Sequence, residues 1–466
     1  MTKNIISKIK RIKFDKIYSS RGLPTIKCTV FTGENKQFEA SCPSGASTGS
    51  KEAAVVTNGQ LLKEQNTEEN EIIRKYNDKD VELVIKQAEE ALIPEILKYN
   101  CSNIYEFDQL IKKIDGTENY SKYGANIVLP LSICMARLIA DQKNLPLYEY
   151  LEKEYDFIER TETFTNLQDA IANTSQNIVE KNFPSPNFNI LNGGAHSGNE
   201  MPFQEIMVNF SGNYDEALRK ATIFYNHLKK VISTTYGSIY TGYGDEGGYM
   251  PPIKTLDEAI DLIRKTNLDL KFKDLRIAVD SAANDFYSNQ KYNFNVSETE
   301  TGQIHAVSYN GEEMVQFYLD ILEKYPEIYL LEDPFAEEDI ESWKSLTASL
   351  KETKKLILGD DLVVTNPKII QNAISDGWCN SVLIKPNQIG CVSDTLTAIR
   401  LAHDNGFKCM VSHRSGETED DFIADLCIGA STDFIKSGSP RGERLIKYNK
   451  ILKIYNDKIL KINNET

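Results

Sequence analysis

The chain has 466 residues, of which 41% are hydrophobic and 26% charged, so it has the composition of a globular protein and the length for two domains. Its formal net charge of −15 argues against nonspecific binding of nucleic acid, whose phosphates attract basic surfaces. An acidic chain can still carry a local cationic pocket, so the charge of a small ligand must be inferred from its site.

The pattern of cysteines and the length of the apolar runs indicate the cellular compartment in which the protein works. The eight cysteines include no C-x-x-C pair and several lie within apolar runs, which predicts buried free thiols in a reducing compartment. The basic N-terminal stretch lacks the continuous apolar segment of a signal peptide. The longest apolar stretch, 125–140, contains Arg137 and is too short to cross a bilayer. We expect a cytoplasmic protein that does not associate with membranes.

The N-terminal third predicts a small mixed domain. Residues 8–43 alternate as strands do and contain two turn signals, which predicts an antiparallel meander. Helical periodicity follows over 81–99 and again over 124–143, and these apolar faces should pack on the meander. We predict an α+β domain over 1–150 and, because the next segment is polar and without an obvious strand, an insertion or linker over 151–183.

Glycine-rich loops connect the early segments. PSGASTG contains Ser47, and such a loop is typical either of a flexible turn or of small hydroxyls and bare amides that close over a phosphate or a metal. NILNGGAHSGNEMPFQE carries His196, Gln204 and Glu205, although a single histidine in a glycine loop is more often structural than catalytic. GYGDEGG sets Glu246 between glycines, which favours close approach of a ligand.

Three short apolar runs between residues 328 and 389 each end on a charged side chain. YLLEDPF, LILGDD and SVLIKPNQIG present Glu332, Asp360 and Lys385, and each run has the length and β-branched content of a buried parallel strand. The hydrophobicity stops where the charge begins. These charges are therefore predicted to stand at strand ends.

The same pattern extends to both sides. RIAVD ends on Asp280, KCMVSH on His413 and DFIK on Lys436. The steps from Glu332 onward are 28, 25, 28 and 23 residues, each enough for one strand and one returning helix, which is typical of a (β/α) barrel. We predict this barrel over 184–466.

The segments between these strands carry helix boundaries. Asn366, followed by proline, predicts a helix start, and Ser393 and Thr418 are further candidates for N-caps. Gly406 and Gly429 fall where helices should end.

Strand-end side chains of a barrel converge on one mouth. Three acids and two lysines would face one another there, as in a hard-metal site with cationic helpers. A lone acid after a strand is more often a helix cap or a solvated loop residue, but six strand-end charges in sequence order are harder to explain as caps. No P-loop or dinucleotide fingerprint occurs in the sequence, so nucleotide chemistry is not indicated.

Many long motifs in one order carry a resemblance to a known family. The sequence contains SRGLPT, PSGASTG, DGTENYSKYGAN, NILNGGAHSGN, GDEGG, LLEDPF, KPNQIG and SHRSGETED, and over nearly its whole length it resembles enolase, the phosphopyruvate hydratase of glycolysis. The resemblance implies a small α+β domain followed by a (β/α)8 TIM-like barrel whose first units depart from simple alternation. It also implies a homodimer and the hydro-lyase reaction that interconverts 2-phospho-D-glycerate and phosphoenolpyruvate.

The resemblance further implies a magnesium site and a set of roles. Asp280, Glu332 and Asp360 would bind the first Mg²⁺, and Ser47 would join a second Mg²⁺ that arrives with the substrate. The remaining roles are Lys385 as base, Glu246 with Glu205 on the acid side, Lys436 at the substrate carboxylate, Arg414 and Ser415 at the phosphate, and Gln204, His196 and His413 in the rest of the pocket.

Two alternatives stay open at the level of sequence. The chain could be a related enzyme that abstracts an α-proton from a different acid, although the PSGASTG loop and the residues 413–415 suit a phosphate. It could also be a paralogue retained as a binding or scaffold protein, although a scaffold has no need of a cluster of like charges, which is unfavourable to bury.

Overall fold

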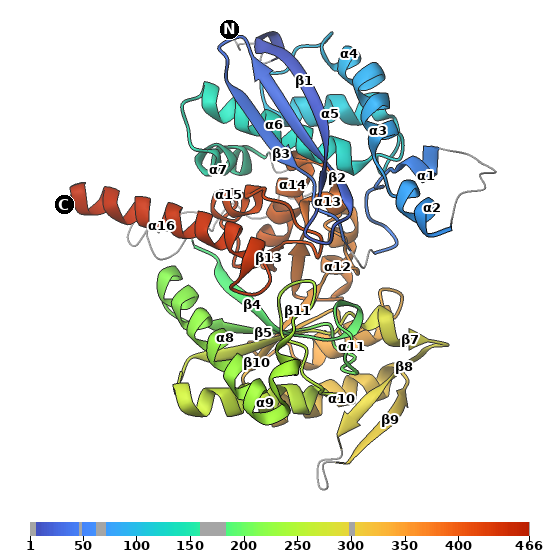
Figure 1. The fold of residues 1–466 in the computed structure, drawn as a ribbon, viewed down its shortest axis with the longest axis vertical. Coiled ribbons are helices and arrows are strands. Elements are labelled where there is room, and N and C mark those ends of the chain that lie inside the picture. The colour runs from blue at the N-terminus through green and yellow to red at the C-terminus, as the bar shows by residue number, and fades with distance from the viewer. Residues whose placement is uncertain (1–5, 46–48, 62–70, 159–182, 298–302, 466) are drawn as a thin grey trace.

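The computed structural model describes residues 6–45, 49–61, 71–158, 183–297 and 303–465, so most of the predicted linker lies outside the described residues. The N-terminal elements, blue to cyan in Figure 1, lie together against one end of a closed barrel.

The predicted meander is confirmed. After the short 3-10 turn η1 (Ile6–Lys8), the strands β1 (Ile9–Tyr18), β2 (Pro24–Thr32) and β3 (Gln37–Ser41) form an antiparallel sheet in the order β1-β2-β3. Ile26, Cys28 and Val30 of the central strand β2 are fully buried on one face of the sheet, because every second residue of a strand points to the same face.

Helices cover this sheet, as the periodicity predicts. The helix α6 (Ala125–Gln142) contacts β2 and β3, and the Cys134 thiol donates to the Cys28 carbonyl at 3.3 Å. Its side chains are buried nearly all round, since the meander lies on one side and the barrel helices on the other. The helices of this part are α1 (Asn58–Leu61), α2 (Glu71–Asp78), α3 (Glu82–Gln87), the π-helical turn η2 (Ala88–Leu92), α4 (Ile93–Ile96), α5 (Ile104–Asp115), α6 (Ala125–Gln142) and α7 (Leu147–Phe157).

The closed barrel has the expected departure at its start. The ring order is β10-β11-β12-β13-β14-β4-β5-β6, in which β5 runs antiparallel to both neighbours and the other pairs are parallel. Two strands and two helices come first, and six strand-helix units follow. The strands are β4 (Ser185–Asn192), β5 (Glu205–Phe210), β6 (Leu275–Asp280), β10 (Ile328–Glu332), β11 (Leu356–Gly359), β12 (Ser381–Ile384), β13 (Lys408–Ser412) and β14 (Phe434–Lys436).

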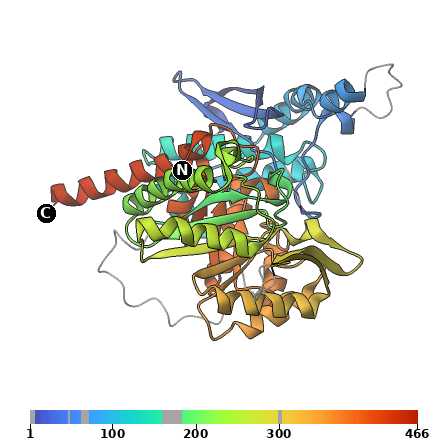
Figure 2. The same cartoon turned by 60° about the horizontal axis from the view of Figure 1, so that its bottom comes forward.

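Helices surround the barrel, and α16 extends well beyond its body (Figure 2). They are α8 (Tyr214–Tyr236), α9 (Leu256–Leu270), α10 (Gly311–Lys324), α11 (Ile340–Ser349), α12 (Pro367–Asp376), α13 (Pro386–Ile389), α14 (Val392–Asp404), α15 (Phe422–Gly429) and α16 (Leu445–Glu465). A small sheet of β7 (Tyr287–Ser288), β8 (Lys291–Ser297) and β9 (Ile304–Tyr309) follows β6, and the 3-10 turns are η4 (Gly194–His196), η5 (Ser238–Thr241), η6 (Ala283–Phe286) and η7 (Gly442–Arg444).

One of the three predicted N-caps is correct. Asn366 accepts a hydrogen bond from the Lys368 amide at the start of α12. Ser393 lies inside α14, whose N-cap position is Cys391, so that prediction is wrong. Thr418 precedes α15 by several residues and is also wrong, because that helix follows Asp421.

The small domain contacts the mouth of the barrel. Ser44 forms an isolated antiparallel bridge with Gly416, and the Ala53 amide donates to the Gln388 carbonyl at 2.7 Å. Arg137 of α6 binds Asp420 with both terminal guanidinium nitrogens, Nη1 and Nη2, at 2.8 and 3.0 Å. Below the mouth the interior of the barrel is filled with side chains, namely Met207, Ala278, Tyr329, Leu330, Leu358, Leu383 and Met410.

Within the part of the chain that the structure describes, no helix has the length and apolar character that crossing a bilayer requires.

Candidate active site

The registers of neighbouring strands bring the predicted acids together. Glu205, Asp280 and Glu332 are Cα partners across β5, β6 and β10. Because β5 is antiparallel to β6, its first residue lies at the mouth where the other strands end, so Glu205 opens its strand instead of closing it. On the opposite part of the ring, Ser412 of β13 is the partner of Lys436 of β14.

Lys436 lies at the centre of these acids. Its Nζ atom lies 2.7 and 2.8 Å from the two carboxylate oxygens of Glu332, 3.2 Å from Asp280 Oδ2 and 3.3 Å from Glu205 Oε1. Burial alone would lower the pKa of Lys436, but the three carboxylates raise it well above its ordinary value. The lysine is therefore charged at neutral pH.

Lys385 pairs with a different acid. Its Nζ atom lies 2.5 Å from Asp360 Oδ2, and Gln388 Nε2 donates to the other oxygen of Asp360 at 2.9 Å. Burial opposes the charge on this lysine, yet the neighbouring Asp360 raises the pKa of Lys385 above its ordinary value. In this state Lys385 carries a proton.

The mouth holds acidic clusters that fit a divalent metal ion. Their donors are mainly carboxylate oxygens, which hard cations prefer, and burial together with Asp280 raises the pKa of Glu332 well above its ordinary value. A bound cation would stabilise the ionised form of such a buried carboxyl group. Two sets of donor atoms lie within 4.8 Å of one another, His196-Glu205-Glu246 and Asp333-Asp360-Asp361.

The predicted trio of Asp280, Glu332 and Asp360 is neither of these two sets, and its oxygens are instead paired with Lys436 and Lys385. Asp333 and Asp361 were not predicted. Each directly follows a predicted acid, and Asp333 accepts from the amides of Asp360 and Asp361 at 2.8 and 2.9 Å. The paired acids in LLEDPF and LILGDD were the signal that could have found them.

Glu246 faces the acids from the glycine-rich loop. Asn189 Nδ2 donates to Glu246 Oε2 at 3.2 Å, and His413 Nε2 lies 3.2 Å from the same oxygen. His196 Nδ1 lies 3.7 Å from Oε1. Burial and the charge of Glu246 raise the pKa of Glu205 well above its ordinary value, so we place the proton of this carboxyl pair on Glu205.

Arg414 and the serine after it lie on the loop that follows β13. Arg414 donates to both carboxylate oxygens of Glu52, at 3.0 and 3.1 Å, and to Asn387 Oδ1 at 3.0 Å. Glu52 was not predicted, because nothing in the sequence shows that it meets a residue so far along the chain. A buried bidentate pair of this kind fixes the plane of the guanidinium group.

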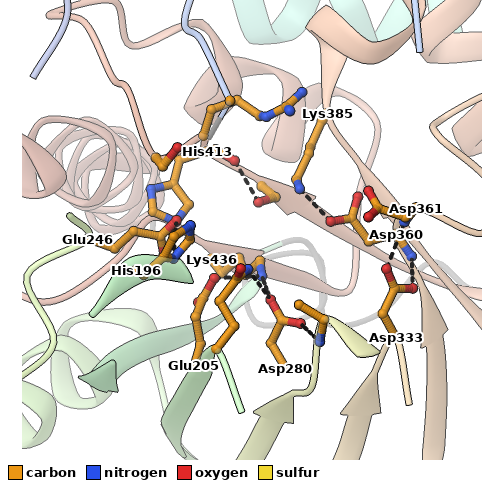
Figure 3. Close-up of a pocket in the computed structure, with 16 residues that line it drawn as sticks. His196, Glu205, Glu246, Asp280, Asp333, Asp360, Asp361, Lys385, His413 and Lys436 are labelled. Carbon is orange, nitrogen blue, oxygen red and sulfur yellow. Dashed lines mark hydrogen bonds and ion pairs between the residues drawn. The ribbon is translucent and has the colours of Figure 1, made fainter. Parts of the chain in front are cut away.

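These residues line one polar cavity (Figure 3). Several of its buried polar atoms find no hydrogen-bond partner within the described residues, including Gln204 Oε1, Glu205 Oε2 and Ser415 Oγ. A polar ligand would satisfy them. Of the predicted site residues, the cavity is lined by His196, Gln204, Glu205, Glu246, Asp280, Asp360, Lys385, His413, Arg414, Ser415 and Lys436. Glu332 is fully buried against Lys436 and is not part of the lining, and Ser47 lies outside the described residues.

Comparison with known proteins agrees with this arrangement. Residues 9–151 match the family model "Enolase, N-terminal domain", and residues 180–461 match "Enolase, C-terminal TIM barrel domain". The chain is 38% identical over 455 residues to an enolase of a Nitratiruptor species, with 96% of each chain covered. It is 38% identical over 452 residues to enolase B of Dictyostelium discoideum (96% of this chain, 94% of the relative) and 37% identical over 452 residues to enolase 1 of Entamoeba histolytica (96% and 95%). The chain therefore belongs to the enolase family of lyases.

Proposed function

We propose that this enolase interconverts 2-phospho-D-glycerate and phosphoenolpyruvate with a lysine base and a carboxyl acid on opposite sides of one cavity. The observation that carries the proposal is the placement of Lys385 across the cavity from Glu246 (Figure 3). Removal of the C2 proton needs a base, and departure of the C3 hydroxyl needs an acid. Lys385 must give up its proton, and with it the ion pair to Asp360, before it can accept one from the substrate.

The charged residues around the two groups suit an anionic substrate. The α-carboxylate gains a second negative charge when the proton leaves, and Lys436, which its acidic neighbours keep charged, would stabilise that charge as it develops. Arg414 and Ser415 would bind the phosphate, and Gln204, His196 and His413 would complete the pocket.

Two Mg²⁺ ions are the cofactors that we propose. Asp280, Glu332 and Asp360 would hold the first, and Ser47 would join the second, which arrives with the substrate. When bound, magnesium supplies positive charge that stabilises the second negative charge on the substrate carboxylate. Oxygen-only ligands suit magnesium better than zinc or copper.

The first test is turnover of the full-length protein, followed by the ultraviolet absorbance of phosphoenolpyruvate. We expect turnover with magnesium and its loss when a chelator removes the metal. Folded, metal-loaded protein that leaves 2-phosphoglycerate unchanged would contradict the proposed reaction.

The second test separates base from acid. Lys385→Ala should abolish exchange of the C2 proton with solvent, because no other group takes that proton. Glu246→Gln should retain exchange and lose dehydration, since an amide cannot protonate the leaving hydroxyl. Equal exchange rates in the lysine variant and the parent would reject Lys385 as the base.

We also propose that the protein is a homodimer and works in the cytoplasm as a glycolytic enzyme. Its partners would be the small-molecule substrate and a second copy of the chain. We expect it to bind neither nucleic acid nor a membrane. The eight cysteines are all free and buried, which supports a reducing compartment. Family membership supports the dimer. Light scattering on the purified protein tests it, and the mass of a single chain would contradict it.

A further inference from the structure

Arg444 joins three segments of the active site although no part of the proposed chemistry uses it. It ends the 3-10 turn η7, and its side chain is 1% exposed. Its Nη1 atom donates to His413 Nδ1 and to the Arg414 carbonyl, each at 2.7 Å. Its Nη2 atom donates to the carbonyls of Asp245 and Ser415, at 2.7 and 2.6 Å. Nη2 also donates to the Ser20 hydroxyl at 3.3 Å, so each of the four hydrogens on the terminal nitrogens has an acceptor.

The contact with His413 determines which ring nitrogen carries the proton. A guanidinium group has only donors, so the Nδ1 atom that faces Arg444 at 2.7 Å must be an acceptor. The proton of a neutral His413 is then on Nε2. Burial, against the opposing effect of Glu246, lowers the pKa of His413 to about 4, so the ring is neutral at physiological pH.

The tautomer of His413 in turn differentiates the two oxygens of Glu246. Oε2 accepts from Asn189 Nδ2 at 3.2 Å, and His413 Nε2 lies 3.2 Å from the same oxygen, so two donor atoms lie beside it. Oε1 faces His196 Nδ1 only at 3.7 Å, which is beyond hydrogen-bond distance. A proton on Oε2 would lie beside both donor atoms, and a proton on Oε1 would lie beside neither of them.

We propose that Arg444 is a positioning residue that fixes His413 as the Nε2–H tautomer and thereby directs to Oε1 the proton that Glu246 must take up before it acts as the acid. The inference rests on the proposed role of Glu246 as the acid. In the other tautomer the Nε2 lone pair would face Glu246, which would draw the carboxyl proton to Oε2 and hold it between Glu246 and His413. The acid would then be present but its proton would be misdirected, as a wrong tautomer impairs other proton-transfer sites.

The tautomer can be measured directly on the full-length protein. With ¹⁵N-labelled histidine, long-range ¹H–¹⁵N correlation distinguishes protonated from unprotonated ring nitrogens, and loss of one signal set in His413→Asn identifies His413 among the five histidines. We expect an unprotonated Nδ1 and a protonated Nε2 in the parent. A protonated Nδ1 would overturn the proposal whether or not any Arg444 variant folds, and this readout needs neither substrate nor turnover.

The rates of dehydration and of C2 proton exchange in Arg444 variants then distinguish a positioning role from a purely structural one. Arg444→Gln should lower dehydration by about 10²-fold or more, the usual contribution of a general acid, and lower C2 proton exchange by a much smaller factor. Arg444→Lys keeps one donor for Nδ1 and should restore part of the dehydration and the Nε2–H tautomer. A fall of both rates by the same factor, with the tautomer unchanged, would show a structural role only and overturn the proposal.

The matched control is Arg441→Gln, on the same loop. Arg441 lies over the Tyr243 ring, with 3.5 Å from its guanidinium carbon to the ring centroid, and donates to the Tyr225 hydroxyl at 3.4 Å, so its loss disturbs the loop without touching His413. Its ratio of exchange to dehydration should equal that of the parent. Absence of turnover in the parent would instead contradict the proposed function, and the tautomer measurement would still stand.

Discussion

At the scale of single residues, the loop that carries Glu246 depends on a glycine beside it. Gly247 has φ +85°, and a Cβ there would lie 2.1 Å from Ser439 Oγ. The Tyr225 hydroxyl donates to the Gly247 carbonyl at 2.5 Å, and the Ser439 amide donates to the Glu246 carbonyl at 3.0 Å. The loop is therefore held from two sides, and its close approach to the segment after β14 requires the absence of a side chain.

We expect Gly247→Ala to remove most of the dehydration activity. A backbone strained by about 1–3 kcal/mol and a collision with Ser439 would displace Glu246, and misplacement by about 1 Å can lower a rate about 10²-fold. The control is Gly237→Ala, where φ is +106° and a Cβ would meet nothing within 4 Å. It should lose stability through strain and keep its activity. Urea unfolding and turnover of both variants decide the matter, and equal activities would contradict the expected displacement.

The acids and lysines at strand ends could be predicted because each follows a run of apolar residues, which is a local signal. Arg444, Asn189 and Glu52 could not, since what they do depends on partners far away in the chain. Arg444 even stands in SGSPRGERL, close to a predicted site residue, but nothing in that string indicates that its side chain turns back to His413. Sequence patterns identify charges at a mouth more readily than the groups that orient them.

At the scale of elements, the start of α14 is completed by another domain. Asp108 of α5 accepts from the Ser393 amide at 2.9 Å, so a carboxylate that is distant in sequence does what an N-cap side chain usually does. This is why Ser393 failed as a predicted cap. The helix can begin two residues earlier because the free amide of Ser393 is satisfied by a tertiary contact. The direction of the antiparallel strand β5 could not be predicted from the sequence either. Only its pairing with β6 shows that its first residue lies at the mouth.

We expect Asp108 to make stability depend on pH. Burial raises the pKa of Asp108 from 3.8 to about 7, so the folded state holds this proton more tightly than the unfolded state does. The resulting stabilisation is fully present below the ordinary pKa and is lost as the pH rises to the folded value, on the order of 4 kcal/mol in all. Asp108→Asn keeps an acceptor for Ser393 and cannot ionise.

The measurement is urea unfolding of parent and variant on both sides of that pKa. The parent should lose stability relative to Asp108→Asn as the pH rises through the window. Parallel profiles would mean that the carboxyl titrates alike in the folded and unfolded states.

At the scale of the whole molecule, ion pairs join the small domain to the barrel. Arg137 reaches Asp420 and Asp421, and Lys112 lies 3.2 Å from Asp394. Part of the active site comes from each domain as well, because Glu52 binds Arg414. An enzyme built this way should lose its site and its fold together.

We therefore expect one cooperative unfolding transition. The two tryptophans, Trp343 and Trp378, are both in the barrel, so their fluorescence follows the barrel while far-ultraviolet circular dichroism follows the whole chain. The two signals should coincide in denaturant. Arg137→Met should lower the free energy of unfolding by about 2–3 kcal/mol, because two acids lose charged hydrogen bonds.

Lys36→Met is the matched control for that substitution, since Lys36 pairs with Asp141 at the surface within the small domain. It should leave the coincidence of the two signals unchanged. A circular dichroism transition in the parent that precedes the fluorescence transition would contradict cooperative unfolding.

The buried thiols determine how fast this protein is oxidised during storage. Cys28, Cys42, Cys101 and Cys134 lie in the small domain, and Cys379, Cys391, Cys409 and Cys427 lie in the barrel. Alkylating agents and peroxide react with an accessible thiolate, yet burial raises the pKa of Cys42 and of Cys379 to about 12. These thiols can therefore be oxidised only after local unfolding exposes them. The rate at which the protein is oxidised on storage would measure how often each domain unfolds locally.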